Sequence, residues 1–373
     1  MFGSRNFLFA KVSGSVVPAG KLYAWGLNNQ RQLGQGASTT NYSSPKQVGS
    51  ATTWTQVSGG GYHVGGLVSS GTLKTWGSNS NGQIGTGTTG GGVPYVGLSR
   101  ANNSFVNAGR FQTRIITTTG TLFGWGDNTY GGLGLGNTTN YYSPKQVGAL
   151  TNWAKLDAIG SFSCAAIKTD GTLWTWGNNL QGRLGLGNTT NYSSPKQVGS
   201  DTSWASLASY GGRSRRSCAA IKTNGTLFTW GGGGYGVLGH GNTTDYSSPK
   251  QVGALTNWAK IANLYTGFVA VKTDGTLWTW GSNGSGQLGL GNTTNYSSPK
   301  QVGALTNWSI PIGGYYFNGC IKTDGTMWSW GSNNFGQLGL GNTTNYSSPK
   351  QIGSLTTWIS GGTTNYSMMG IAS

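Results

Sequence analysis

A thirteen-residue stretch, GNTTNYSSPKQVG, occurs at residues 187–199 and 291–303, and again with one change at 341–353. Shorter or edited copies lie near residues 36–49, 136–148 and 241–253. This internal repeat constrains the fold more than any other feature, because a chain that repeats itself builds one structural unit many times. The dipeptide Trp-Gly sets the period at about 50 residues, since it recurs at Trp25, Trp76, Trp125, Trp176, Trp230, Trp280 and Trp330.

One unit, residues 258–303, shows what each repeat contains. WAKIANL alternates apolar and polar residues, FVAVKT is rich in β-branched residues, and TLWTWG alternates again. The dipeptide Asp-Gly between the second and third segments is a tight-turn signal. Good helix formers are nearly absent, and no apolar stripe of 3.6-residue period is visible. The pattern therefore predicts four short antiparallel strands per unit.

Seven such units predict a closed ring. A four-stranded sheet cannot bury both of its faces alone, but radially stacked sheets cover one another. The 68 glycines alone would suggest low complexity, but 16 Trp, 17 Tyr and 11 Phe can build a core that disordered chains lack. We therefore predict an all-β fold, a seven-bladed β-propeller formed as one domain by residues 19–373. The Trp of each Trp-Gly is expected to pack between blades.

The two ends of the chain predict how the ring closes. The tail, residues 358–373, aligns with the first two strands of a unit and stops where the turn would begin. The head, from about residue 19, aligns with the third strand. One composite blade would then pair both ends and leave no open sheet edge. Residues 1–18 fall outside this count and are expected to form an N-terminal extension, either an ordered strand or an attachment arm.

The charge is sparse and positive, with 24 Lys plus Arg, seven Asp plus Glu, and a net charge of +17. Such an excess suits an acidic partner such as nucleic acid, an anionic glycan or a membrane surface. The alternative is that lysines were copied with each repeat, which would space them around a ring. We favour this alternative for ten lysines: Lys46, Lys145, Lys196, Lys250, Lys300, Lys350, Lys168, Lys222, Lys272 and Lys322.

The acidic and histidine residues do not predict an enzyme. The chain has no Glu, and the turn residues Asp170, Asp274 and Asp324 occupy equivalent places in different units, so paired carboxylates are not expected. His63 and His240 lie in different units and give no metal-ligand spacing. Segments such as GLGLGN lack the Lys-Ser/Thr ending of a phosphate-binding loop. We predict neither catalysis, nor a cofactor, nor a metal site.

The cysteines and the N-terminus leave the cellular compartment open. Cys164, Cys218 and Cys320 lie in different units, where they should not approach within the distance that a disulfide needs. The first residues contain too short an apolar run for a signal-peptide core, and no run is long enough to span a bilayer.

The repeat resembles a known family. VKTDGTLWTWGSNGSGQLGLG, residues 271–291, is similar to the repeat of the regulator-of-chromosome-condensation family, with its turn glycine, its strand ending in Trp-Gly and its Asn-x-x-Gly-Gln-Leu-Gly. The resemblance covers residues 19–373 and implies a seven-bladed propeller completed by both termini. Members include GTPase nucleotide-exchange factors, chromatin binders, a plant ultraviolet sensor and a secreted inhibitor of β-lactamases. This chain lacks the long wedge insertion of the exchange factors and the Trp-Arg-His-Thr signature of the sensor.

Function is expected where the copies disagree. They differ most in the loop between the first and second strands and in the turn after Trp-Gly. Both connections lie on the same side of an antiparallel blade, so these variable segments should converge on one face rich in aromatic residues and Arg, which is typical of recognition surfaces. The alternative is that the aromatic residues plug the ring or pack on neighbouring blades. The predicted binding residues are Tyr62, His63, Arg110, Phe111, Arg114, Phe162, Arg213, Arg215, Arg216, Tyr265, Phe268, Tyr315, Tyr316 and Phe317, with Tyr130, Tyr235 and Phe335 as additional candidates.

The sequence therefore predicts a non-catalytic recognition or structural protein that binds a protein or a surface glycan through this face. The Asn-, Thr-, Ser- and Gly-rich, charge-poor composition suggests an extracellular or virion location, and a phage tail or particle component is the specific hypothesis. The alternatives are a nucleic-acid or chromatin binder, and a nucleotide-exchange protein for a small GTPase. Oligomeric state is not indicated.

Overall fold

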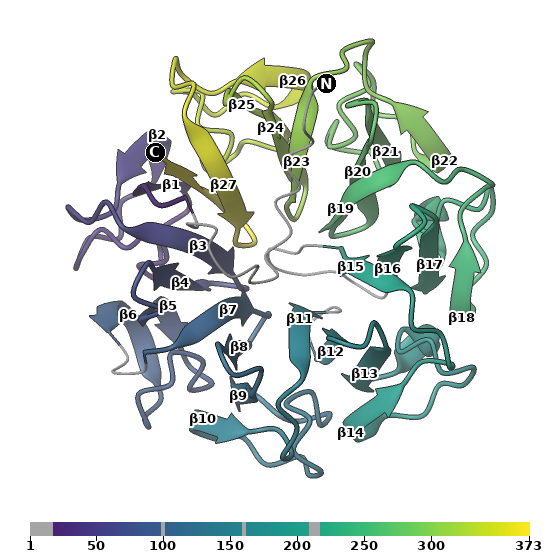
Figure 1. Cartoon of the computed structure of the whole chain (residues 1–373). Helices are drawn as coiled ribbons and strands as arrows, with labels where there is room; N and C mark the ends of the chain where they lie inside the picture. Colours follow the sequence, from purple (N-terminus) through teal and green to yellow (C-terminus); the bar gives the residue numbers. More distant parts are fainter. Residues whose placement is uncertain (1–17, 98–100, 159–161, 209–216) are drawn as a thin grey trace.

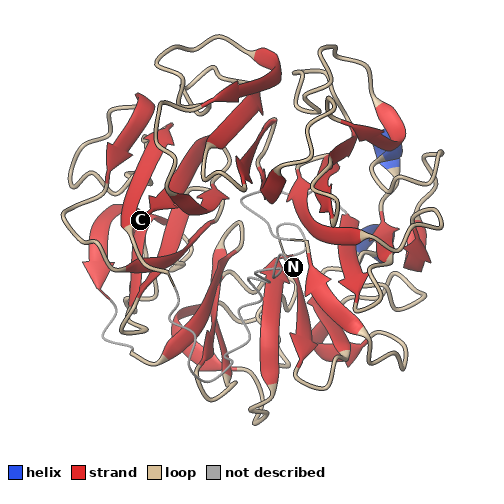
Figure 2. Ribbon diagram, turned by 45° about the horizontal axis from the view of Figure 1, so that its top comes forward, coloured by secondary structure: helices blue, strands red, loops and turns tan. Residues whose placement is uncertain are grey.

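A computed structural model describes residues 18–97, 101–158, 162–208 and 217–373, and the strands form a ring of seven sheets around a common axis (Figure 1). Each sheet has four antiparallel strands, as the repeat pattern predicted. Figure 2 shows that strands and loops make up almost all of the ring, and the part of the chain that the structure describes includes two short 3₁₀ turns. The prediction of an all-β, seven-bladed propeller is confirmed.

Six blades are continuous in sequence, and their innermost strand comes first. The strands and 3₁₀ turns are, blade by blade, β3 (Trp54–Gly59), β4 (His63–Val68), β5 (Leu73–Asn79) and β6 (Gly90–Gly97); β7 (Asn103–Ala108), β8 (Gln112–Thr117), β9 (Leu122–Gly126) and β10 (Tyr141–Gln146); β11 (Trp153–Ala158), β12 (Ser163–Lys168), β13 (Leu173–Gly177), η1 (Leu180–Gly182) and β14 (Tyr192–Gln197); β15 (Trp204–Leu207), β16 (Ser217–Lys222), β17 (Leu227–Gly231), η2 (Gly234–Gly236) and β18 (Tyr246–Gln251); β19 (Trp258–Leu264), β20 (Gly267–Lys272), β21 (Leu277–Gly281) and β22 (Tyr296–Gln301); β23 (Trp308–Gly313), β24 (Phe317–Lys322), β25 (Met327–Gly331) and β26 (Tyr346–Gln351).

The seventh blade is composite and closes the ring. Its strand order is β2-β1-β28-β27, where β1 is Lys21–Gly26, β2 is Tyr42–Gln47, β27 is Trp358–Thr363 and β28 is Ser367–Ala372. β1 pairs with β28 in unbroken antiparallel register from the Lys21–Ala372 pair to the Gly26–Ser367 pair. The prediction that both ends of the chain complete one blade is confirmed, and closure removes the edges that an open array would expose.

The Trp of every Trp-Gly joins its blade to the preceding one. All seven indoles are fully buried. Each Nε1–H donates to a backbone carbonyl of the preceding blade at 2.9–3.0 Å. The Trp25–Gln337 bond joins the composite blade to the blade of β23–β26 in the same way. Burial of so large a side chain together with its polar atom makes these residues the main connection between blades.

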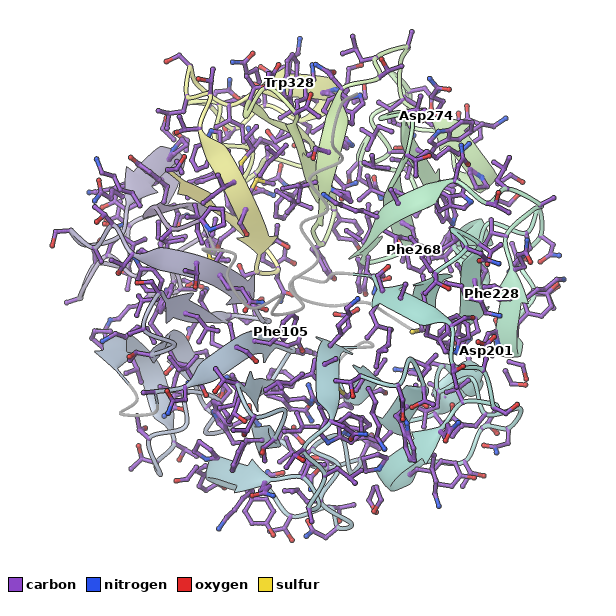
Figure 3. The ribbon with its side chains drawn as sticks, in the orientation of Figure 1. Phe105, Asp201, Phe228, Phe268, Asp274 and Trp328 are labelled. Atoms are coloured by element: carbon purple, nitrogen blue, oxygen red, sulfur yellow. The ribbon has the colours of Figure 1, made fainter. Side chains whose placement is uncertain are left out.

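The connections between second and third strands form one side of the ring, the turn face. At Asp170, Asp274 and Asp324 the carboxylate accepts hydrogen bonds from the hydroxyl and the backbone N–H of the Thr two residues later. The Thr hydroxyl bond, followed by the backbone bond, lowers the pKa of each carboxyl. Figure 3 places Asp274 and Trp328 far from the ring axis and Phe268 nearer to it.

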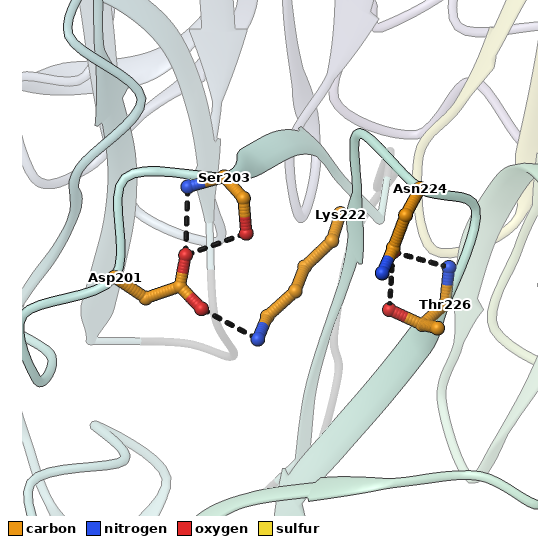
Figure 4. A network of polar contacts seen from close by, with 5 residues as sticks. All are labelled: Asp201, Ser203, Lys222, Asn224 and Thr226. Atoms are coloured by element: carbon orange, nitrogen blue, oxygen red, sulfur yellow. Dashed lines mark hydrogen bonds and ion pairs between the residues drawn. The ribbon is translucent and has the colours of Figure 1, made fainter.

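The blade of β15–β18 varies this turn. Asn224 replaces the Asp and still accepts from Thr226, while Asp201, which also accepts from Ser203, forms an ion pair with Lys222 at 2.5 Å (Figure 4). The hydrogen bond from Lys222 is the main reason that the pKa of Asp201 falls to about 2. Acidic groups on the turn face are therefore used in local structure.

The lysines are spaced around the ring, as expected for residues copied with each repeat. Six outer strands carry one Lys each, and its ammonium lies 4.0–5.5 Å from the ring centroid of the Tyr that begins the same strand. On the turn face, Lys168, Lys222, Lys272 and Lys322 lie over aromatic rings of their own blades. These ten lysines are thus distributed over the blades rather than gathered in one patch.

Three further predictions concern the N-terminal extension, the cysteines and membrane-spanning segments. Residues 1–17 of the predicted N-terminal extension lie outside the described residues, so its role stays a prediction. Cys164, Cys218 and Cys320 are buried free thiols on three different strands, and burial raises the pKa of Cys164 to about 12. Within the described ranges, no helix has the length and apolar character to cross a bilayer.

Candidate functional site

The face opposite the turn face, which we call the loop face, combines two variable connections of each blade. They join the first strand to the second and the third strand to the fourth. The residue before the second strand uses its carbonyl oxygen to accept the N–H of the residue after Trp-Gly, as in the Tyr62–Ser78 and Phe111–Asp127 pairs. The repeat therefore fixes the backbone of the variable loops against the third strand.

The glycine of Trp-Gly makes this contact possible. In Gly126 the backbone has a φ of 104°, and an added Cβ would lie 2.3 Å from the carbonyl oxygen of Phe111. Only glycine combines that φ with so close an approach. The scaffold thus dictates where the residue before the second strand sits, and leaves its side chain free to vary.

Five of the seven blades place an aromatic residue at this one backbone position. All five side chains are partly exposed: Tyr62, Phe111, Phe162, Tyr316 and Tyr366. Four of them are among the predicted binding residues. Tyr366 was missed, although its place in the repeat, directly before the last strand, was sufficient to find it.

The aromatic rings form a connected arc across neighbouring blades. Tyr366 lies 5.2 Å from Tyr315 and 6.4 Å from Tyr62, measured between ring centroids. Tyr315 in turn lies 4.1 Å from Tyr265 and 4.3 Å from Tyr316. Tyr265 and Tyr315 are mostly buried, so they present little surface to a partner and serve mainly to pack against the other rings of the arc. Phe335, an additional candidate, joins it at 5.2 Å from Tyr366.

A second group lies on the blades of β7–β10 and β11–β14. The guanidinium of Arg110 lies 4.4 Å from the ring centroid of Phe111, which is 6.1 Å from Phe162. Phe162 also contacts Tyr130 at 5.0 Å. This group presents a cation over an aromatic face next to two further rings, an arrangement suited to protein contacts.

Four predicted binding residues point into the protein instead. His63, Arg114, Phe268 and Phe317 have no exposed surface. They lie on second strands, where side chains pack between blades, whereas the partly exposed residues precede those strands. Phe268 packs against Trp280 at 5.6 Å. A partner cannot touch these four side chains in this structure, so the loop face does not include them.

Two of these buried residues are ionisable. His63 Nε2 lies 2.9 Å from the Thr113 hydroxyl, and burial lowers the pKa of His63 to about 3. Arg114 donates to the carbonyl oxygen of Gly132 at 2.6 Å and to the Gln112 side chain, and burial lowers its pKa against the opposing effect of Asp157. Arg114 stands where the other blades have Gly, Ala, Val or Met, so sequence pattern alone suggested an exposed loop residue.

The remaining candidates differ in accessibility. Arg213, Arg215 and Arg216 lie outside the described residues, so their predicted role stays a prediction. Tyr130 and Tyr235 are 39% and 58% exposed. Leu180, at 53%, is a further apolar side chain of this face that the sequence analysis missed, because attention went to aromatic and Arg residues.

Backbone hydrogen bonds join loops of neighbouring blades around the axis. Tyr265 N–H donates to the carbonyl oxygen of Gly314, Asn365 N–H to that of Gly61, and Gly61 N–H to that of Arg110, all at 3.2 Å. These bonds tie the loops to one another as well as to their own blades. The loop face is therefore a preorganised surface, which reduces the ordering cost of binding. Among the described residues no cluster of three His, Cys, Asp or Glu could hold a metal ion.

Comparison with known proteins identifies the repeat. A family profile described as "Regulator of chromosome condensation (RCC1) repeat" matches residues 19–67, 119–167, 170–214, 224–263, 274–314 and 324–364. A second profile of the same description matches residues 54–83. Together these matches cover more than half of the chain.

Two curated relatives share part of this sequence. The E3 ubiquitin-protein ligase HERC2 of Mus musculus is 30% identical over 241 residues, which are 62% of this chain and 5% of the ligase. The ultraviolet-B receptor UVR8 of Arabidopsis thaliana is 31% identical over 240 residues, 64% of this chain and 43% of the receptor. The chain thus spans less than half the length of either relative.

Two solved structures have the same fold at low sequence identity. Human WBSCR16 superimposes with a TM-score of 0.84 at 19% identity, covering 95% of this chain and all of that one. Prp20p from Saccharomyces cerevisiae, described with "Its Binding Properties to Gsp1p and Histones", gives 0.83 at 18% identity, covering 96% and 93%.

Proposed function

Because the chain belongs to the regulator of chromosome condensation (RCC1) repeat family, we propose that it is a non-catalytic recognition protein that binds a protein partner through its loop face. The observation that carries this proposal is the aromatic position shared by five blades. Five partly exposed rings stand at one backbone position on a rigid ring, and the scaffold does not require an aromatic there, since Thr266 occupies the same place in the blade of β19–β22.

The chemistry of the face suits a protein partner. Aromatic residues and Arg supply large contact areas with few rotatable bonds, and such residues dominate the binding energy of protein interfaces. The described loop residues add Arg110 over Phe111 and the exposed Tyr130, Tyr235 and Leu180. Prp20p, which has the same fold, is described with two protein partners. A glycan partner and a virion role have no comparable support and are not part of the proposal.

Two alternatives from the sequence stay open as predictions. Nucleic-acid or chromatin binding would use Arg213, Arg215 and Arg216 together with the lysines spaced around the ring, and its affinity should fall steeply with salt, with a slope of about −0.9 per phosphate neutralised. Nucleotide exchange on a small GTPase would appear as faster release of labelled GDP.

The test compares three variants of the intact chain in quantitative affinity capture from an extract of the source organism. The first replaces Tyr62, Phe111, Phe162, Tyr316 and Tyr366 with Ser. The second changes only exposed side chains of the same face, as Tyr130→Ser, Leu180→Ser and Tyr235→Ser, so that folding is unaffected. The matched control changes three lysines on the outer strands of the blades, which form the rim of the ring, as Lys196→Gln, Lys300→Gln and Lys350→Gln.

We expect partners captured by the wild type to fall at least tenfold with the first variant and severalfold with the second. The rim control should keep them. Loss of capture in the rim control with no loss in the second variant would show that the loop face was the wrong choice. Each purified variant is first checked for an unchanged circular dichroism spectrum.

A further inference from the structure

The rims of neighbouring blades are joined by a hydrogen bond that recurs at six of the seven junctions. A glycine in the connection between third and fourth strands donates its N–H to a carbonyl oxygen at the start of the next outer strand, at 2.8 Å. The six donor glycines are Gly87, Gly136, Gly187, Gly241, Gly291 and Gly341. A Cβ added to any of them would lie 3.4–3.6 Å from a Ser hydroxyl of that neighbouring strand.

The seventh junction, between the composite blade and the blade of β3–β6, is open. Its equivalent glycine, Gly36, makes no such bond among the described residues, and a Cβ there would meet no atom within 4 Å. The cause is β6, which reads GGGVPYVG where the other outer strands read YSSPKQ or YYSPKQ. The repeat pattern is therefore broken at one place on the rim.

A second departure from the repeat pattern lies across the same junction from β6. Arg31 occupies the position held in the other six blades by glycines with φ of 71–75°, and it has a φ of 59° itself. In those blades a Cβ would lie 2.3–2.7 Å from the next outer strand, so a side chain is impossible there. Opposite Arg31 the neighbouring strand has Gly92, whose carbonyl oxygen accepts from the guanidinium at 2.5 Å. A non-glycine residue held in this conformation is strained, and such strain concentrates at functional sites.

The two departures border an open surface hollow of about 540 Å³. It is lined from one blade by Gln30 and Arg31 and from the other by Asn79, Gly90 and Gly91. No acidic residue contributes to the lining, so Arg31 gives the hollow a positive charge.

Gly90 and Gly91 are not explained by the fold of the chain itself. Neither has a positive φ, and a Cβ at either would meet no atom within 4 Å. A strand glycine without a conformational or packing reason often marks a place where another backbone approaches closely. β6 is also an outer edge strand, and it lacks the Lys that the other six outer strands carry and that discourages edge pairing.

We propose that this open junction binds an extended peptide segment of a protein partner, with the peptide backbone along β6 and an Asp or Glu side chain on Arg31. Main-chain pairing with a free sheet edge is a general mode of peptide recognition, and a pocket beside the edge supplies specificity. The guanidinium fork matches a carboxylate geometrically, and the net charge of +17 favours an acidic segment over a basic one. This site is on the rim and is separate from the aromatic arc.

The test uses a synthetic array of twelve-residue peptides that each carry one Glu flanked by Val, Thr and Ser in varied order. A second array has Gln in place of Glu. Labelled intact protein is applied as the wild type, Arg31→Gln, Gly91→Val and Gly284→Val. Gly284 is the matched control, because it also has no positive φ and no atom within 4 Å of an added Cβ, but it lies in the blade of β19–β22.

We expect the wild type and Gly284→Val to bind a subset of Glu peptides at least tenfold more tightly than their Gln counterparts. Arg31→Gln should remove that preference, and Gly91→Val should abolish binding to both arrays. Absence of binding by the wild type, or binding that Arg31→Gln and Gly91→Val leave unchanged, overturns the proposal. Loss of the aromatic residues of the loop face should not affect this assay, so the two sites are tested independently.

Discussion

The turn face and the loop face are built by the same repeat. They differ in whether their polar and aromatic side chains find their contacts within the blade. On the turn face, Asp274 bonds to Thr276, Thr276 accepts from Trp278, and Lys272 lies over that indole. On the loop face, rings such as Tyr62 and Tyr316 keep part of their surface exposed. The comparison teaches that the repeated residues satisfy one another's hydrogen bonds and ring contacts within a blade. The variable residues instead keep exposed surface that a binding partner can contact.

The largest effect should come from the buried indoles that hold the blades together. Trp280→Ala leaves a cavity and removes the bond to the carbonyl oxygen of Val237, so we expect the free energy of unfolding to fall by about 3–5 kcal/mol. The loop-face change Tyr235→Ala, at a side chain 58% exposed, should stay within about 0.5 kcal/mol. Urea unfolding measures both, and equal losses would contradict the division between scaffold and face.

The second effect concerns His63, a residue next to the loop face that is buried. Its pKa is lowered from 6.5 to about 3, so the unfolded chain takes up a proton near pH 6.5 while the folded chain does not. Stability is then complete above pH 6.5 and declines as the pH falls toward 3, by about 2–3 kcal/mol at pH 4.5.

His63→Gln should remove most of that pH dependence, and Gln is the residue at the equivalent position in the blade of β7–β10. His240→Gln is the control, because that side chain is partly exposed and should change the profile less. Urea unfolding between pH 7.5 and 4 gives the profile. A wild-type protein that is equally stable at pH 7.5 and pH 4 would show that His63 is accessible to protons. His63 would then count as a residue of the loop face.

The smallest effect is expected on the turn face, where Asp201 pairs with Lys222. The pKa of Asp201 is lowered from 3.8 to about 2, so its contribution is present above pH 4 and is lost as the pH falls through 2. Because the Asp201 side chain is 35% exposed, Asp201→Asn should cost only about 0.2–1 kcal/mol at pH 7. Thermal unfolding at low and high salt checks this, and a loss well above that range would mean that the turn face carries more than local structure.

Much of the fold could be predicted because its signals are local and repeated. Alternating strands, the Asp-Gly turn and Trp-Gly fix the blade, and the alignment of head and tail fixes the closure that the pairing of Lys21 with Ala372 shows. The candidate site was predicted less well. Tyr62 and Arg114 are both residues of variable segments, and only the register of the second strand places one at the surface and the other between blades.

The sequence by itself determined the number of blades, the composite closure and the side on which the variable loops gather, because strand alternation and period are properties of the chain alone. The tertiary structure decided which loop side chains remain exposed, since that depends on neighbours supplied by adjacent blades about 50 residues away, as in the His63–Thr113 contact. It also decided that one rim junction is open. Arg31 and Gly90–Gly92 are far apart in sequence, and only ring formation brings these two departures from the repeat face to face.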